Sequence, residues 1–69
     1  MFFYVYVLQS KKDSKFYTGY TNDLRRRFQE HNKGLSFATK GRGPFGLIYY
    51  EAYLNRQDAE ERERFLKTG

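Results

Sequence analysis

Hydrophobic and polar positions form blocks along the chain, and the first blocks predict a β-hairpin. Residues 2–8 (FFYVYVL) are apolar or aromatic at both parities, which is typical of a strand covered on both faces and therefore central in its sheet. Residues 9–15 are polar and predict a turn, and residues 15–20 (KFYTGY) predict a second strand. Gly19 inside that strand indicates a bulge or a close approach of the backbone.

The next block predicts a helix over residues 22–33. Thr21 and Asn22 belong to the residue types that cap helix N-termini. Gly34 follows the block, where a glycine in the left-handed conformation commonly ends a helix.

The remaining blocks predict a loop, a third strand and a second helix. Residues 34–46 contain four of the six glycines and the only proline, which is the composition of a loop. Residues 47–54 (LIYYEAYL) predict a strand, and Asn55, with an acid three positions later, is expected to cap a helix that runs towards Lys67. The order β-β-α-β-α predicts an α+β fold, a three-stranded, mostly antiparallel sheet flanked by helices.

Composition narrows the chemistry, because the 69 residues include one histidine and no cysteine. The length predicts one domain over residues 1–69. Without cysteine, zinc knuckles and thiol nucleophiles are excluded, and any bound metal is expected to be a hard cation with oxygen ligands. The net charge of +5 arises in the sheet, the first helix and the loop. The apolar start is too short for a membrane span and has no basic leader, so we expect a cytoplasmic protein without membrane contact.

Helical periodicity places polar residues on the apolar stripe of the first helix. At 100° per residue Leu24, Phe28 and Leu35 share one stripe, with His31 in its middle. Arg27 lies about 60° from Leu24, at the edge of the stripe. Arg26 and Lys33, in contrast, point to the far side of the helix. His31 is then either a core histidine bonded to a backbone carbonyl or part of a functional site.

The second helix has the same irregularity. Ala59 and Leu66 define its apolar stripe, and Glu63 lies between them. Burying an ionised carboxylate without a partner is costly, so Glu63 is expected to pair with Arg27 or Arg62, to bind a cation, or to reach solvent through a cleft.

These residue types suit phosphodiester cleavage. A cation at Glu63 would stabilise the leaving oxygen, Arg27 would bind the scissile phosphate, and His31 or a tyrosine would deprotonate water. A tyrosine can do so if nearby positive charge lowers its pKa of about 10, and the strand pattern alone selects none of the seven. Flanking phosphates are expected on the basic residues Lys11, Lys12, Arg25, Lys40 and Arg42.

Several stretches together carry a family resemblance. Residues 4–6 (YVY) and 17–19 (YTG) stand where two short tyrosine motifs would fall, and residues 20–32 (YTNDLRRRFQEHN) contain a helix with an arginine and a histidine. Residues 59–63 (AEERE) place a glutamate four positions after an alanine. In these stretches the chain resembles the GIY-YIG nuclease domain, in the small single-domain form that is similar to the N-terminal nuclease domain of an excision-repair enzyme.

The resemblance implies a divalent-metal-dependent endonuclease that hydrolyses DNA phosphodiester bonds, in repair or recombination. It implies that Tyr6 is the base for the attacking water and that Tyr17 and Arg27 contact the phosphate or the water. His31 corresponds to the family's histidine, and Glu63 would bind Mg²⁺ or Mn²⁺. Whether Tyr6 or His31 takes the proton is left open.

Two alternatives to an active nuclease remain. Relatives commonly continue past position 69 with another helical segment that carries an asparagine, and that segment has no counterpart here. One alternative is a catalytically inactive nucleic-acid-binding module of the same fold, and another is a structural protein in which Arg27 pairs with Glu63. The expected DNA is double-stranded or branched, and the oligomeric state is open between monomer and dimer.

Overall fold

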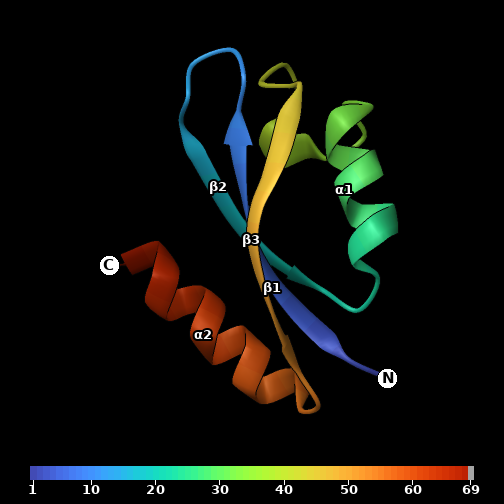
Figure 1. Ribbon diagram of the computed structural model, residues 1–69, viewed down its shortest axis with the longest axis vertical. Coiled ribbons are helices and arrows are strands. Elements are labelled where there is room, and N and C mark those ends of the chain that lie inside the picture. The colour runs from blue at the N-terminus through green and yellow to red at the C-terminus, as the bar shows by residue number, and fades with distance from the viewer. Residues whose placement is uncertain (69) are drawn as a thin grey trace.

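Strand β1 (Phe3–Ser10) lies at the centre of a three-stranded antiparallel sheet, between β2 (Phe16–Thr21) and β3 (Phe45–Tyr53). The computed structural model shown in Figure 1 describes residues 1–68. It confirms the α+β order β-β-α-β-α and the central position predicted for the first strand. None of the described helices has the length and apolar character that crossing a membrane requires.

Two helices cover opposite faces of this sheet (Figure 1). These two helices are α1 (Leu24–Asn32) and α2 (Arg56–Thr68), and a short 3₁₀ helix, η1 (Phe37–Thr39), follows α1. Tyr6 of β1 points to the face of α1, where it meets His31. Its neighbour Val5 pairs with Glu51, which binds Arg62 of α2 on the other face. The alternation of side chains along a strand thus assigns one face to each of α1 and α2.

Helix α1 begins two residues later than the sequence predicts. The side chain of Asp23, and not those of Thr21 and Asn22, caps it by accepting a hydrogen bond from the backbone nitrogen of Arg26 at 3.2 Å. The hydroxyl of Thr21 instead accepts a bond from the backbone nitrogen of Asp23, which forms the turn before the helix.

The end of α1 confirms one prediction and corrects another. Gly34 has a φ of +73° and ends the helix in the left-handed conformation, as predicted. Leu35 therefore lies beyond the helix and is 70% exposed, so its predicted place on the apolar stripe is wrong. Helical periodicity applies only as far as the helix extends.

The segment predicted as a loop is partly regular, because it contains η1 and the first two residues of β3. Phe45 of β3 is 2% exposed and belongs to the core. The side chain of Asn32 accepts a hydrogen bond from the Phe45 nitrogen at 2.6 Å and donates one to its carbonyl at 3.3 Å. These two bonds fix the last residue of α1 to the start of β3.

The core lies between the sheet and α1. Tyr6, Leu8 and Phe45 form its buried centre, and partly buried apolar side chains pack around them: Tyr17, Leu24, Phe28 and Leu47. Burying a large apolar side chain contributes about 1.5–3 kcal/mol, so these few residues stabilise much of a small domain. Tyr6 is both a core residue and a candidate functional residue, so the site is built on the buried centre of the fold.

Candidate active site

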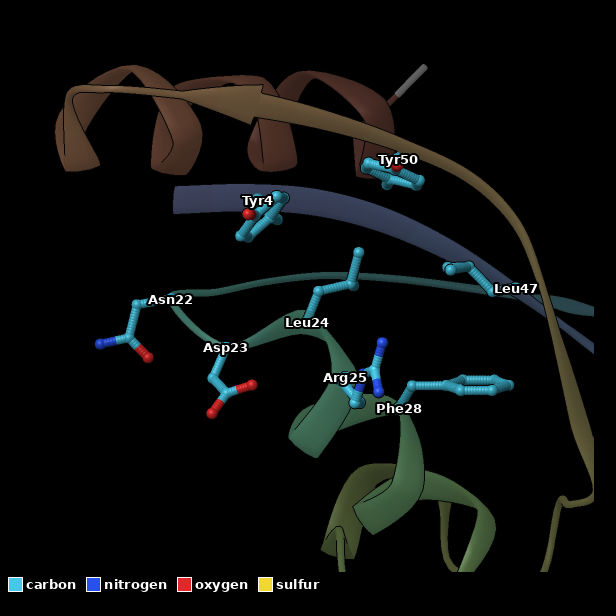
Figure 2. A pocket seen from close by; sticks show the side chains of 8 residues that line it. All are labelled: Tyr4, Asn22, Asp23, Leu24, Arg25, Phe28, Leu47 and Tyr50. Atoms are coloured by element: carbon cyan, nitrogen blue, oxygen red, sulfur yellow. The ribbon is translucent and has the colours of Figure 1, made fainter. Parts of the chain in front are cut away.

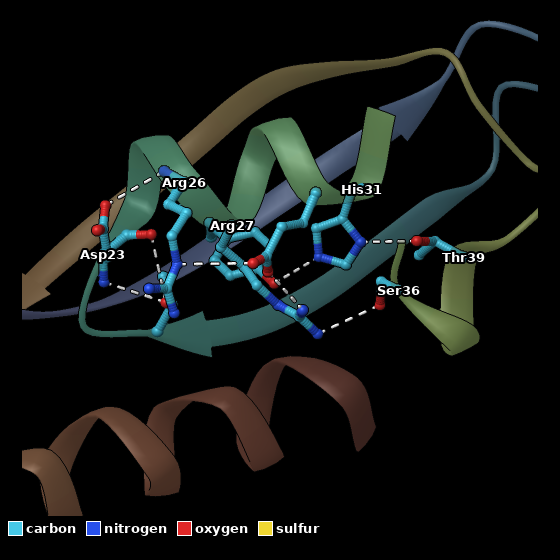
Figure 3. Close-up of polar contacts among 9 residues, drawn as sticks. Asp23, Arg26, Arg27, His31, Ser36 and Thr39 are labelled. Atoms are coloured by element: carbon cyan, nitrogen blue, oxygen red, sulfur yellow. Dashed lines mark hydrogen bonds and ion pairs between the residues drawn. The ribbon is translucent and has the colours of Figure 1, made fainter. Parts of the chain in front are cut away.

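A chain of hydrogen bonds runs from Tyr6 through His31 to Thr39. The Tyr6 hydroxyl lies 2.8 Å from Nε2 of His31. Nδ1 of His31 lies 2.6 Å from the Thr39 hydroxyl, a contact that Figure 3 shows. All three side chains are buried, with exposed fractions of 1% or less. His31 is a buried histidine, as one interpretation of the sequence predicted, but its partners are two hydroxyl groups and not a backbone carbonyl.

Burial keeps both members of the Tyr6–His31 pair uncharged at neutral pH. It lowers the pKa of His31 to about 4, and the positive charge of Arg27 acts in the same direction, while Glu30 opposes both. Burial also raises the pKa of Tyr6 to about 12, against the effect of Arg27. A tyrosine that acts as a base needs a lowered pKa. The pKa of Tyr6 is instead raised.

A neutral imidazole donates from one nitrogen and accepts at the other. The two hydroxyls bonded to His31 therefore take opposite roles. In one tautomer the Tyr6 hydroxyl donates to Nε2, and Nδ1 donates to the Thr39 hydroxyl. A proton leaving Tyr6 then has an acceptor already in place.

Gly19 provides the space in which Tyr6 lies. The two residues face each other across β1 and β2, and a Cβ atom on Gly19 would fall 2.5 Å from the Tyr6 hydroxyl oxygen. The close approach predicted at Gly19 is thus made by a side chain, whereas the irregular register lies between β1 and β3, at Val7 and Leu8. The Tyr17 ring packs 5.1 Å from the His31 ring, so both tyrosine motifs converge on His31.

Two contacts hold the guanidinium of Arg27. Nη1 donates to Glu30 at 3.0 Å. Nη2 donates to the Ser36 hydroxyl at 3.2 Å, a contact that Figure 3 shows. The Arg27 side chain is 34% exposed, whereas that of Arg26 is 72% exposed. This difference confirms that neighbouring arginines of α1 have different environments.

Glu63 pairs with neither Arg27 nor Arg62, although such a pair was one of the three alternatives that the sequence left open. Its carboxylate lies 3.1 Å from Nζ of Lys67, and its side chain is 17% exposed. Arg27 pairs with Glu30, and Arg62 pairs with Glu51 at 2.9 Å. An Arg27–Glu63 pair that closes the cleft is therefore absent among the described residues.

Glu63 nevertheless influences the Tyr6 hydroxyl, which is also bonded to His31 of α1. Its negative charge, like that of an ionised Tyr17, raises the pKa of Tyr6. The Lys67 ammonium also lies 5.6 Å from the centre of the Tyr17 ring. The structure thus groups Tyr6, Tyr17 and Arg27 around His31, and Lys67 connects Glu63 to the Tyr17 ring.

Glu63 fits a cation that keeps most of its water. Within residues 1–68, no three histidine or acidic side chains gather into a metal-binding group. Mg²⁺ is commonly bound through one or two carboxylates together with water and substrate phosphate. A single carboxylate matches that mode of binding and does not match an all-protein cage.

The basic residues predicted to contact nucleic acid fall into two groups. Hydrogen bonds from Lys11 to Pro44 and from Lys12 to Gly41 join the β1–β2 turn to the loop before β3. This end of the molecule, at the top of Figure 1, carries Lys11, Lys12, Lys40 and Arg42. Arg25 lies apart from them, at a hollow of about 530 Å³ between α1 and β3 that Tyr4 and Tyr50 also line (Figure 2).

Sequence reasoning missed several supporting residues. Glu30 and Lys67 follow Arg27 and Glu63 at helical spacings of three and four, so side-chain pairing along a helix would have found them. Ser36 and Thr39 meet α1 only through the path of the loop, and no local pattern indicates them.

The fold and this site define a GIY-YIG domain. The model of the GIY-YIG catalytic domain matches residues 2–68, and the chain belongs to that family, which implies a nuclease-type function. The UPF0213 protein CPE1444 of Clostridium perfringens is 45% identical over 65 residues, which cover 93% of this chain and 69% of the relative. The UPF0213 protein OB0043 of Oceanobacillus iheyensis is 42% identical over 66 residues, covering 93% of this chain and 74% of the relative.

A solved structure supports the fold. The solution NMR structure of the UPF0213 protein BH0048 from Bacillus halodurans is 40% identical to this chain and superimposes with a TM-score of 0.63. The match covers 100% of this chain and 73% of that one. The three-stranded sheet with two helices is therefore an architecture found in a close relative.

Proposed function

We propose that the protein is a divalent-metal-dependent endonuclease that hydrolyses phosphodiester bonds of DNA. The observation that carries this proposal is the convergence of Tyr6, Tyr17, Arg27, His31 and Glu63 from β1, β2, α1 and α2. Membership of the GIY-YIG family supports the reaction class. The net charge of +5 suits an anionic polymer.

Arg27 is the residue proposed to bind the scissile phosphate. A guanidinium presents several donors in one plane and matches the oxygens of a phosphate. Glu30 and Ser36 fix its orientation, while about a third of the side chain stays exposed to a substrate. A divalent cation at Glu63 would stabilise the charge that develops on the leaving oxygen.

Tyr6 and His31 are proposed to act as one proton relay. With a pKa of about 12, Tyr6 is not a tyrosinate at neutral pH. It can take a proton from the attacking water only while it passes its own proton to Nε2 of His31, which is neutral and 2.8 Å away. The imidazolium then formed keeps its Nδ1 bond to Thr39.

The test is a plasmid-nicking assay with Mg²⁺, with Mn²⁺ and with EDTA. We expect nicking that requires the metal and is lost in Glu63→Gln, because the amide is a poor cation ligand. Glu61→Gln is the matched control, since Glu61 is exposed on the same helix. Nicking that persists in EDTA or in Glu63→Gln would contradict the proposal.

A catalytically inactive nucleic-acid-binding module is the second candidate. It is favoured by the almost complete burial of Tyr6 and His31, which also lets them act as ordinary core residues. This module would shift DNA in gels in a salt-dependent way and would leave it intact with every metal. Comparing linear with branched duplexes in the same assay tests whether the substrate is double-stranded or branched.

A further inference from the structure

A second hollow lies beside the candidate active site and shares Arg27 with it. Its volume is about 410 Å³, within the roughly 300–1,000 Å³ of small-molecule sites. We call this space the Arg56 hollow. It is lined by Phe3, Tyr20, Thr21, Asn22, Arg27 and Arg56. Two arginines from different helices thus face one space, and none of the described lining residues is acidic.

Arg56 is positioned at this hollow by two neighbours. Its Nη2 lies 3.5 Å from the Tyr20 hydroxyl, and its Nε lies 3.3 Å from the carboxylate of Glu60. Neither Glu60 nor Glu30, the carboxylate partner of Arg27, is among the lining residues. The acids therefore orient the guanidinium groups from outside, and the surface facing the hollow is positive.

The lining suits one nucleotide of a nucleic-acid chain. Guanidinium groups bind the oxygens of a phosphodiester, and the Asn22 amide adds a neutral hydrogen-bonding group. Phe3 and Tyr20 add aromatic surface against which a sugar or base can pack. A site for a small inorganic anion would not need these rings.

We propose that the Arg56 hollow binds the nucleotide next to the scissile phosphate of DNA, with Arg56 holding its phosphate. This assignment rests on the proposed function, because it takes Arg27 as the residue at the scissile phosphate. Arg56 is then a substrate-binding residue, and it extends the path of the DNA from α1 to the start of α2.

The experiment measures binding of a mixed-sequence DNA duplex in EDTA by fluorescence anisotropy over a series of NaCl concentrations. One phosphate contact contributes about 0.9 to the slope of log affinity against log salt. Arg56→Gln is therefore expected to lower that slope by about 0.9, so its loss of affinity is about threefold smaller at roughly 200 mM than at 50 mM salt. Arg64→Gln, an exposed arginine on α2, is the matched control.

A second pair of variants covers the case in which Arg56→Gln fails to fold. Glu60→Gln frees Arg56 from its ion pair and is expected to strengthen DNA binding, whereas Glu61→Gln is the control for loss of one negative charge. The proposal is overturned if Arg56→Gln leaves the salt slope unchanged. It is also overturned if DNA affinity changes equally in Arg56→Gln and Arg64→Gln, and equally in Glu60→Gln and Glu61→Gln. Deoxythymidine monophosphate is titrated in parallel, and an Arg56-dependent loss of its binding alone would assign the hollow to free nucleotides and also overturn it.

The nicking assay separates this proposal from the proposed function. If the wild type binds DNA through Arg56 but no metal supports nicking, the Arg56 hollow is retained as a DNA-phosphate site and the endonuclease is rejected. If the wild type nicks DNA and Arg56→Gln behaves like Arg64→Gln in binding, the endonuclease is retained and the Arg56 hollow is rejected.

Discussion

The hydroxyl of Tyr6 lies 2.8 Å from Nε2 of His31, and this bond joins the centre of the sheet to the last turn of α1. Both side chains are 1% exposed. A buried polar atom without a partner destabilises a fold by about 1–3 kcal/mol, so each of these residues requires the other. The same bond therefore serves the stability of the domain and the proposed proton relay.

The pKa of His31 predicts how the stability of the domain depends on pH. The unfolded chain binds a proton at His31 below about pH 6.5, whereas the folded chain binds it only below about pH 4. Between these values the unfolded state holds more protons, so the free energy of unfolding falls as the pH is lowered. The loss approaches roughly 3 kcal/mol once the pH is below about 4.

Two measurements check this prediction. The chain has one histidine, so its imidazole proton signal in NMR is unambiguous and should titrate near pH 4 in the folded state. Urea unfolding of the wild type and of His31→Asn at pH 7 and pH 4.5 should show a smaller pH effect in the variant. An imidazole that titrates near pH 6.5 in the folded protein would contradict a buried, neutral His31.

Gly19→Ala is expected to displace Tyr6. The added Cβ would fall 2.5 Å from the Tyr6 hydroxyl oxygen and 2.8 Å from its Cζ, and the bond to His31 prevents the ring from moving freely. Overpacking of this kind costs about 1–3 kcal/mol. Chemical denaturation measures the loss of stability, and the nicking assay should show lost activity.

Gly46→Ala is the matched control for that variant. Gly46 lies in β3, and a Cβ there would meet only Lys11, at an ordinary distance of 3.8 Å. It should unfold at nearly the same denaturant concentration as the wild type. Equal stability of the two alanine variants would show that Tyr6 is not tightly packed against Gly19.

The sequence predicts those parts of this protein that depend on local pattern. The strand at residues 2–8 was recognisable because both of its faces are apolar, and Arg27, His31 and Glu63 because they interrupt helical stripes. Contacts that depend on the path of the chain were not predictable. Thr39 reaches His31 only because Asn32 and Phe45 fix both ends of the intervening loop.

The ion-pair partner of Glu63 was likewise not predictable from local sequence pattern. An arginine partner was one alternative for Glu63, yet Arg62 pairs with Glu51 of β3, and Glu63 pairs with Lys67. Glu51 is available to Arg62 because the register of β1 and β3 places it opposite Val5, on the face of α2. No pattern within the helix carries that information.

Ser36→Ala is expected to slow nicking in the fraction of the protein that remains folded. The variant removes the hydroxyl that accepts from Nη2 of Arg27 at 3.2 Å and leaves Glu30 as the remaining partner. A hydrogen bond to a charged group contributes about 1.5–3 kcal/mol, so the rate should fall about tenfold or more if Arg27 binds the transition state. Thr68→Ala, which removes an exposed hydroxyl at the end of α2, is the control. An unchanged rate would mean that Ser36 does not position Arg27.

Lys67→Gln is expected to strengthen the binding of a divalent cation at Glu63. The Lys67 ammonium lies 3.1 Å from that carboxylate and competes with a cation for it. Because exposed ion pairs contribute about 0.2–1 kcal/mol, removing the lysine should lower the Kd for Mn²⁺ up to about fivefold. Titration of free Mn²⁺ by electron paramagnetic resonance measures this Kd without DNA, and Arg64→Gln controls for the change in net charge. A Kd that changes equally in both variants would show that Lys67 acts only through net charge, and weaker binding in Lys67→Gln would place the cation away from Glu63.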